Sequence, residues 1–217
     1  MILSKIIKNS KVIFSSQQRL FSARNNLLNC FKQELEYEEK EYKPISEEEK
    51  KLFFNHSGFE FIESASSARM ELKKKSGDFD VSVCYHARSP MPEEEEANNE
   101  GPTNMVDFQL LINKTGQTGG FLVDAVVMDS QVSINAVHCA KDLKDLHTKF
   151  LTGRIDPDTY QGPDFSTLDE SVQNAFIEFI AELGVNEECA SFIEMSSLDK
   201  DQQLYMNWLK TSKNTLL

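Results

Sequence analysis

The chain has 217 residues, of which 40% are hydrophobic and 10% aromatic, and its 23 Lys and Arg against 35 Asp and Glu give a formal net charge of −12. This composition is typical of a folded domain of ordinary size and excludes a disordered or fibrous protein. The excess of carboxylates argues against a phosphate-binding site for nucleic acid, and no stretch approaches the ~18 consecutive apolar residues of a membrane-spanning helix.

The first 33 residues contain six basic and no acidic side chains, so the rest of the chain has a net charge of −18. Serines and apolar residues lie among these basic residues, which is the composition of a mitochondrial transit peptide. Lys8 and Lys11 interrupt the apolar run that a secretory signal needs. Arg19-Leu-Phe-Ser22 resembles the site of the matrix processing peptidase. We therefore predict a transit peptide over residues 1–21, cleaved after Phe21, and a location in the mitochondrial matrix; a basic tail without a targeting role is the alternative.

The next segment combines helical spacing with strong acidity. Apolar residues recur every three or four positions from Leu27 to Leu35, and residues 34–42 contain five glutamates. This pattern predicts one amphipathic helix that ends near Pro44. The following run, Glu47–Glu49, is interpreted as a linker or a short helical turn.

From Gly58 onward the hydrophobic period changes from about four to two. Six alternating runs predict an antiparallel meander with one buried face. They lie at residues 59–61, 70–72, 79–85, 106–112, 121–127 and 132–138. Turn sequences rich in Gly, Asp and Ser separate several of the runs. A seventh candidate strand lies at residues 160–165.

The longest interruption of the strand pattern is residues 89–102. Prolines, four consecutive glutamates and the absence of apolar periodicity predict a mobile, solvated loop. Its carboxylates could attract Lys-rich and Arg-rich proteins, or they could only keep the protein soluble. The candidate partner-binding residues are Glu93, Glu94, Glu95, Glu96 and Glu100.

After residue 165 the pattern becomes helical again. Thr167-Leu-Asp-Glu170 reads as a capping box, and Gly184 ends the apolar stripe that follows it. Asn186 is predicted to cap a second helix. The order of helix, antiparallel sheet and two helices indicates an α+β chain. The residues expected in the helical core or at an oligomer interface are Phe176, Phe179, Phe192, Tyr205, Trp208 and Leu209.

The search for catalytic chemistry finds little. The four cysteines form no Cys-x-x-Cys pair, so we interpret them as free thiols without a zinc or redox role. The best histidine constellation would use His138, Asp142 and His147 in a metal-dependent hydrolase, but its spacing matches no standard metal site. A strand-end histidine followed by a solvated, charged connection explains this segment better. We predict no enzymatic activity and no cofactor.

A set of motifs stands out between residues 160 and 209, namely Tyr160-Gln-Gly-Pro-Asp-Phe-Ser-Thr-Leu-Asp-Glu-Ser-Val-Gln173, Phe176, Phe179, Gly184-Val-Asn186 and Tyr205-Met-Asn-Trp-Leu209. This set resembles the mitochondrial glycoprotein family, acidic matrix proteins of which one member is also known as the receptor for the globular heads of complement. The rest of the chain is similar in the order of its segments.

This resemblance implies a single domain over residues 22–217 with a twisted seven-stranded antiparallel sheet and helices packed on one side. It also implies a doughnut-shaped homotrimer in which the terminal helices pair across subunits. The implied function is that of a non-enzymatic adaptor or chaperone-like scaffold for basic proteins, linked to mitochondrial translation, ribosome biogenesis or oxidative phosphorylation. A fixed accessory subunit of a larger mitochondrial assembly is the alternative. Separately, we expect the protein to contact nucleic acid only weakly or through a partner.

Overall fold

The computed structural model describes residues 2–88, 105–155, 160 and 162–217, with side chains from residue 21 onward. The predicted acidic loop residues, Glu93 to Glu96 and Glu100, lie outside the described residues. The chain forms two compact units. One contains residues 44–201, and the other contains residues 1–43 together with residues 202–217.

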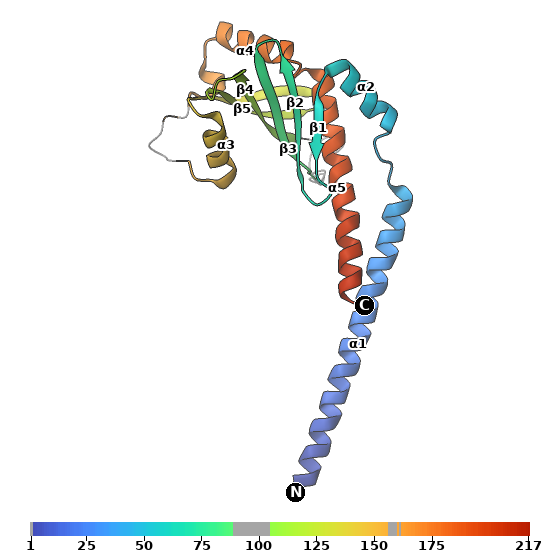
Figure 1. Ribbon diagram of the computed structural model, residues 1–217. Coiled ribbons are helices and arrows are strands. Elements are labelled where there is room, and N and C mark those ends of the chain that lie inside the picture. Colours follow the sequence, from blue (N-terminus) through green and yellow to red (C-terminus); the bar gives the residue numbers. More distant parts are fainter. Residues whose placement is uncertain (1, 89–104, 156–159, 161) are drawn as a thin grey trace, which may run out of the picture. The chain divides into compact units, whose positions relative to one another are not determined.

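The unit of residues 44–201 is built on an antiparallel sheet in which every strand pairs with its sequence neighbours (Figure 1). Its strands are β1 (Glu60–Glu63), β2 (Arg69–Ser76), β3 (Phe79–His86), β4 (Val106–Lys114), β5 (Gly120–Met128) and β6 (Gln131–Ala140). This meander confirms the prediction from the period-two pattern. It arises because short turns allow consecutive amphipathic strands to pair antiparallel.

The predicted seventh strand is wrong for the residues that the structure describes, which contain six strands. At this place a single bridge joins Ala136 of β6 to Asp164. Pro163 has no amide hydrogen to donate, and the Asp164 side chain already accepts from the Ser166 amide at 3.0 Å to begin the 3-10 turn η1 (Phe165–Thr167). The chain therefore turns away from β6 instead of extending along it.

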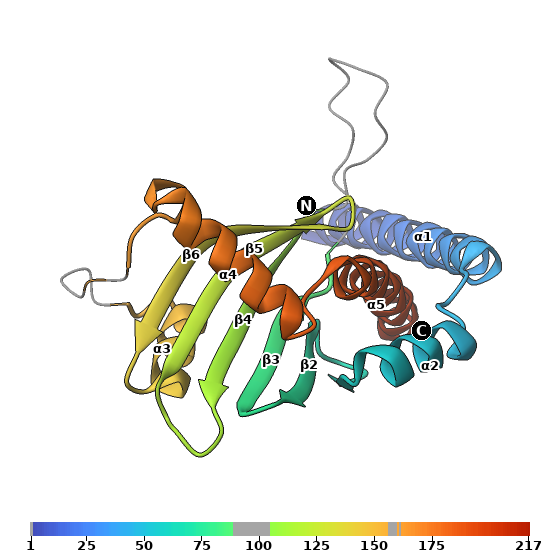
Figure 2. The same cartoon turned by 90° about the horizontal axis from the view of Figure 1, so that it is seen from above.

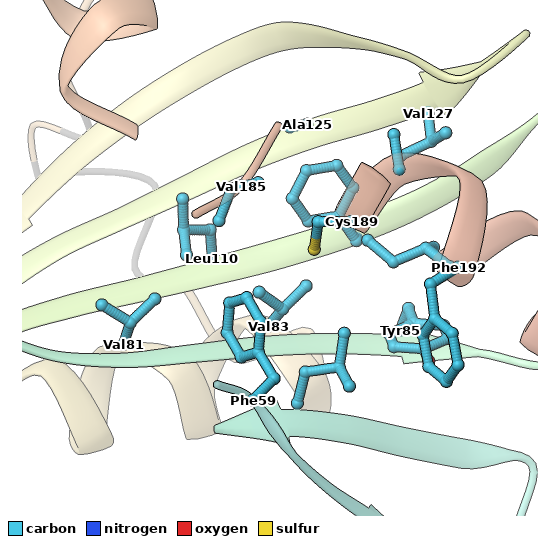
Figure 3. Packing of buried hydrophobic residues seen from close by; sticks show 14 of the residues in the cluster. Phe59, Val81, Val83, Tyr85, Leu110, Ala125, Val127, Val185, Cys189 and Phe192 are labelled. Atoms are coloured by element: carbon cyan, nitrogen blue, oxygen red, sulfur yellow. The ribbon is translucent and has the colours of Figure 1, made fainter. Parts of the chain in front are cut away.

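One face of the sheet carries the main apolar core (Figure 3). Alternate residues of the central strands point into it, and helices α2 (Glu47–Ser57), α4 (Glu170–Glu182) and the first part of α5 (Glu187–Thr215) cover it. The rings of Phe53 and Phe192 stack with centroids 4.1 Å apart. Each fully buried large side chain contributes about 1.5–3 kcal/mol. The strand residues of this core include Leu72, Val81, Val83, Tyr85, Leu110, Ile112, Val123 and Val127.

The opposite face of the sheet, called the second face below, is covered by helix α3 (Leu143–Thr152) (Figure 2). Leu143 of α3 is buried in a smaller cluster with Cys84, Leu111 and Leu122. The expectation that all helices pack on one side is therefore wrong, as is the interpretation of residues 139–147 as a solvated connection. Asp142 caps α3 and Gly153 ends it with φ +62°, so residues at both ends specify a helix here.

Helix α2 is longer than the linker or short helical turn predicted for its first residues. Ser46 accepts a hydrogen bond from the Glu49 amide, and the Glu49 carboxylate accepts from the Ser46 amide, so a capping box begins a helix of 11 residues here.

The start of α4 differs from its predicted capping box. Its N-cap is Asp169, whose side chain accepts from the Ser171 amide at 3.0 Å. Thr167 lies in η1 and donates its hydroxyl to the Asp164 carbonyl at 2.7 Å, so it cannot cap α4. An Asx turn at Asp169 gains a charged acceptor for the first-turn amides.

The predicted helix end and the next cap are confirmed. The Gly184 amide donates to Ala181 O and the Val185 amide to Ile180 O, with Gly184 at φ +96°. These two bonds define a Schellman motif, which needs the left-handed conformation that glycine adopts readily. The Asn186 side chain accepts from the Cys189 amide at 3.2 Å at the start of α5.

The second unit consists of α1 (Ile2–Glu41) and residues 202–217, which include the end of α5. Leu35, Met206 and Leu209 are its buried residues, and Phe31, Tyr42 and Tyr205 pack around them. Helix α1 ends at Glu41, close to its predicted end near Pro44. Among the described residues, no helix combines the length and apolarity needed to cross a membrane.

Candidate functional site

The C-terminal helices of the sheet unit carry a strong charge imbalance. Residues 164–201 contain ten carboxylates and a single cationic side chain, Lys200. Lys200 is 2% exposed and donates to the Glu63 carboxylate at 2.8 Å. No cation of this segment therefore reaches solvent. We call residues 164–201 with their exposed carboxylates the acidic helical surface.

Several of these carboxylates are built into the local structure. Side-chain and backbone hydrogen bonds from Ser166 lower the pKa of Asp164, and the same bonds from Ser171 lower the pKa of Asp169. Glu170, Glu187 and Glu188 lie in the first turns of α4 and α5, where the helix dipole favours negative charge. These carboxylates therefore stabilise the starts of the helices. The hydrogen bonds to Asp164 and Asp169 also favour the ionised form of these two side chains.

Other carboxylates of this surface contact neighbouring elements. The Glu194 carboxylate accepts from the Ser130 amide, with both oxygens at 3.2 Å, and so ties the β5–β6 turn to α5. Glu188 lies 2.7 Å from Nδ1 of His56 in α2. These contacts fix the orientation of α5 against the sheet and α2.

Helix α4 presents the carboxylates that are most available to a partner. Glu178 and Glu182 are exposed, and neither forms an ion pair with any residue that the structure describes. Val172 and Ile177 on the same helix are exposed apolar side chains, at 41% and 48%. Exposed negative charge beside apolar side chains suits the long apolar stems and charged ends of Lys and Arg.

The sequence predicts the partner-binding charge in the acidic loop, which lies outside the described residues and stays a prediction, and further negative charge in the N-terminal helix. On α1, part of this charge serves the unit's own packing. Glu34 accepts from the Tyr205 hydroxyl at 3.0 Å, Glu39 pairs with Lys210 at 2.9 Å, and Glu38 accepts from Gln202. A count of charges over residues 164–201 would have found the acidic helical surface, because a single lysine stands among ten acids.

The aromatic residues predicted for the helical core or an oligomer interface separate into two groups. Phe176, Phe179 and Phe192 contact other rings of the sheet unit, namely Phe121 at 5.5 Å, Phe79 at 5.4 Å and Phe53 at 4.1 Å between centroids. In the second unit, Leu209 is buried, Tyr205 packs beside it, and Trp208 remains 55% exposed although it contacts Phe31. The first group therefore belongs to the core of the monomer. An intersubunit role of the second group stays a prediction.

The histidine constellation does not form a metal centre in the described part of the chain. His138 Nε2 lies 3.0 Å from the Asp124 carboxylate, Asp142 caps α3 through the Asp145 amide, and His147 is buried within α3. Among the residues described, no group of three or more His, Cys, Asp or Glu side chains is placed to hold a metal ion. The three residues of the hydrolase hypothesis are thus engaged in different contacts and form no metal-holding group within the described residues.

Comparisons with known proteins identify the family of the chain. A family model described as mitochondrial glycoprotein matches residues 31–216. The mitochondrial acidic protein mam33 of Schizosaccharomyces pombe is 25% identical over 218 residues, covering 89% of this chain and 78% of the relative.

Two solved structures share the fold. One is a Leishmania major protein described as a sequence homologue of human p32, with a TM-score of 0.66 and 17% identity. The other is the Trypanosoma brucei p22 protein, with a TM-score of 0.67 and 20% identity. Each match covers 90% of this chain and 99% of the solved chain.

Proposed function

Because the chain belongs to the mitochondrial glycoprotein family, we propose that it is a non-enzymatic protein of the mitochondrial matrix that serves as an adaptor or chaperone-like scaffold for basic protein clients. The family description and the name of the fission yeast relative support a mitochondrial role. Clients in mitochondrial translation, ribosome biogenesis or oxidative phosphorylation are the ones that the family suggests.

The observation that carries this proposal is the acidic helical surface: residues 164–201 contain ten carboxylates, of which six are exposed, and one buried lysine. Such a surface creates a negative potential that attracts Lys-rich and Arg-rich segments and that salt screens. Three copies in a homotrimer would place three such surfaces on one molecule. A client that contacts more than one of them would bind with avidity. Weak, salt-sensitive and promiscuous binding of basic clients is the mechanism that follows.

The experiment compares binding of a synthetic 20-residue Lys/Arg-rich peptide to the natural chain and to the double variant Glu178→Gln/Glu182→Gln. We expect the variant to bind at least about fivefold more weakly at low salt and the difference to shrink near 0.5 M salt. The matched control is Asp78→Asn/Glu36→Gln, which removes the same charge outside residues 164–201 and should change affinity by less than about twofold. Equal weakening by both variants would assign the binding to net charge alone.

Co-purification from mitochondria separates this proposal from the alternative of a fixed accessory subunit. Clients that elute between low and high salt support the scaffold. A salt-resistant complex of fixed stoichiometry would overturn it in favour of the subunit.

A further inference from the structure

Helix α3 turns one stripe of side chains toward the second face of the sheet. Leu143, Leu146 and Phe150 pack there in an apolar cluster, and His147 lies in the same stripe at helical spacing. His147 is buried at 8% exposure, and its Nε2 atom has no hydrogen-bond partner among the described residues. The contact between α3 and the sheet therefore contains an ionisable ring with a buried, unpaired nitrogen.

A proton on His147 conflicts with this contact. In the charged imidazolium both ring nitrogens carry a hydrogen, so the buried Nε2 must donate and finds no acceptor in the part of the chain described. A buried charge without a partner is costly as well. The ring also lines a cavity of about 720 Å³ between α3 and the strands β2, β3 and β4, through which a proton can reach it. The neutral ring thus fits the closed position of α3 better than the charged ring does.

The charges that face His147 from the strands leave this conflict in place. Burial lowers the pKa of His147 most, and the positive charge of Arg69 on β2 lowers it further. Glu71 of β2 and Asp124 of β5 act in the opposite direction, but each carboxylate already has a basic partner at 3.0 Å. The net result is a lowered pKa of His147, so the ring is neutral at pH 7.5.

Other titratable groups lie near α3 and have to be separated from His147. On α3 itself, Asp145 pairs with Lys149 at 2.7 Å. On β6, the ring of His138 lies 4.7 Å from that of Phe150. The remaining groups line the cavities that α3 borders, and they are Lys73, Asp80, Cys84, His86, Asp107, Asp142 and Lys144.

The attachment of α3 can be lost without the rest of the fold. Its apolar contacts belong to the smaller cluster, whose buried members on the strands are Cys84, Leu111 and Leu122. The main core lies on the opposite face and, among the residues that the structure describes, includes none of α3. Segments with few apolar contacts open locally at a lower free energy than the whole domain unfolds. Release of α3 therefore uncovers Cys84 and leaves Cys189, a member of the main core, buried.

We propose that α3 is an acid-sensitive cover: protonation of His147 releases the helix from the second face while the sheet and its main core stay folded. In the released helix, water solvates the charged ring and both of its N–H groups. The release uncovers an apolar strip of β3, β4 and β5 that the closed helix hides. This device is independent of the binding of basic clients, which uses the acidic helical surface.

The direction of the pH dependence follows from the two states of His147. In the released helix the ring has the ordinary pKa of about 6.5, and in the closed position its pKa is lower. The closed form is therefore fully favoured above about pH 6.5 and loses this advantage as the pH falls through the closed-state pKa. Between pH 7.5 and pH 5.5 the released population can rise at most about tenfold through this single group.

The test uses the cysteines as reporters. The full chain is exposed to short pulses of 4,4′-dithiodipyridine at pH 7.5 and pH 5.5, and peptide mass spectrometry measures the labelling rate of each thiol. Cys30 is exposed on α1 and serves as the reference for the reactivity of the reagent. We expect the rate of Cys84 relative to Cys30 to rise about five- to tenfold at pH 5.5, and the relative rate of Cys189 to stay within about twofold.

Two histidine variants assign the effect. His147→Gln keeps a polar side chain that does not titrate, so the rise at Cys84 should shrink to less than about twofold. The matched control His56→Gln removes an exposed imidazole of α2, which covers the other face, and should keep the full rise. Hydrogen exchange of the natural chain needs no variant: relative to intrinsic rates, the α3 amides should exchange faster at pH 5.5 and the β4 amides should not.

Three results would overturn the proposal. A Cys84 rate that does not respond to pH would show that the ring takes up its proton while α3 stays closed. A parallel rise at Cys84 and Cys189 would mean that the whole domain unfolds. A full rise in His147→Gln would assign the release to another group, such as His86 or His138.

Discussion

The two faces of the sheet use the same strands in opposite ways. Residues such as Val83 and Tyr85 point into a dry core beneath α2, α4 and α5, whereas their neighbour Ser82 points to the second face, where α3 leaves a polar cavity beside it. Strand alternation makes this division unavoidable, because successive side chains leave the sheet on opposite sides. The first face therefore carries most of the apolar burial, and the second face combines a smaller apolar cluster with polar side chains.

Truncation of the aromatic stack should show the largest effect. Phe192→Ala removes a fully buried ring that stacks on Phe53, and we expect the free energy of unfolding to fall by about 3–5 kcal/mol. Urea denaturation measures this change. Phe150→Ala is the matched truncation on the second face. The Phe150 ring is half-buried against the smaller cluster of the second face, and we expect the free energy of unfolding to fall by about 1–2 kcal/mol. Equal losses would contradict the division between the faces.

Cap removal compares the helices that cover the two faces. Ser46→Ala at α2 and Asp142→Ala at α3 each delete a side chain that accepts a first-turn amide, so each should cost about 1 kcal/mol. Hydrogen exchange should show faster exchange confined to α3 for Asp142→Ala, because α3 rests on the smaller cluster. Global acceleration by Asp142→Ala would mean that the second face is as cooperative as the first.

Relief of backbone strain should give a smaller effect with the opposite sign. Asp129 and Ser130 form the β5–β6 turn with φ of 52° and 60°, a conformation that L-residues adopt at a cost. Asp129→Gly relieves about 1–2 kcal/mol of this cost but gives the unfolded chain more freedom, which returns about 0.4–1 kcal/mol, so we expect a net stabilisation of at most about 1 kcal/mol in urea denaturation. Ser130→Gly should gain less, because it also deletes the hydroxyl that accepts from Ser191 at 2.8 Å. A loss of stability in Asp129→Gly would show that its side chain matters more than its backbone.

The smallest effect is on the pH dependence of stability, to which each histidine contributes separately. The pKa of His147 is lowered by burial in the folded chain, so the unfolded chain binds more protons below about pH 6.5. Its stabilising contribution is complete above that value and declines as the pH falls through the folded pKa. We expect His147→Gln to reduce the stability difference between pH 7.5 and pH 5.5 in urea denaturation.

Partial desolvation and the charge of Arg69 also lower the pKa of His86, so His86→Gln is the control. It should remove a separate part of the pH dependence because His86 lies at the end of β3 and not in α3. An unchanged pH dependence in His147→Gln would show that its imidazole is hydrated in the folded chain.

The strands were predictable because period-two alternation is strong where one face is dry. Helix α3 was missed because the apolar positions Leu143, Leu146 and Phe150 are spread through a charged segment, although Asp142 and Gly153 mark both of its ends. At α4, Asp164, Thr167 and Asp169 compete as caps, and the two aspartates accept the amide bonds. Local sequence does not decide such a competition, because the position of η1 depends on contacts with β6.

The candidate site was only partly visible in the sequence. Charge over residues 164–201 could be counted, but the burial of Lys200 against Glu63 joins segments 137 residues apart and comes from the fold. The unpaired Nε2 of His147 likewise results from the packing of α3 on the sheet. Patterns of hydrophobicity record which face is buried, and they carry no information about which polar atom lacks a partner.

The stacking of Phe53 on Phe192 sets a condition on how the molecule is made. Neighbouring hairpins can form in the order of synthesis, since every strand pairs with the one before it. The helix that closes the apolar face, however, begins only at residue 187. A chain that emerges with its N-terminus first, from a ribosome or through a translocation channel, would therefore expose a finished sheet that lacks the cover of α4 and α5 until those helices arrive. We expect this protein to need protection from aggregation during that interval of its own biogenesis.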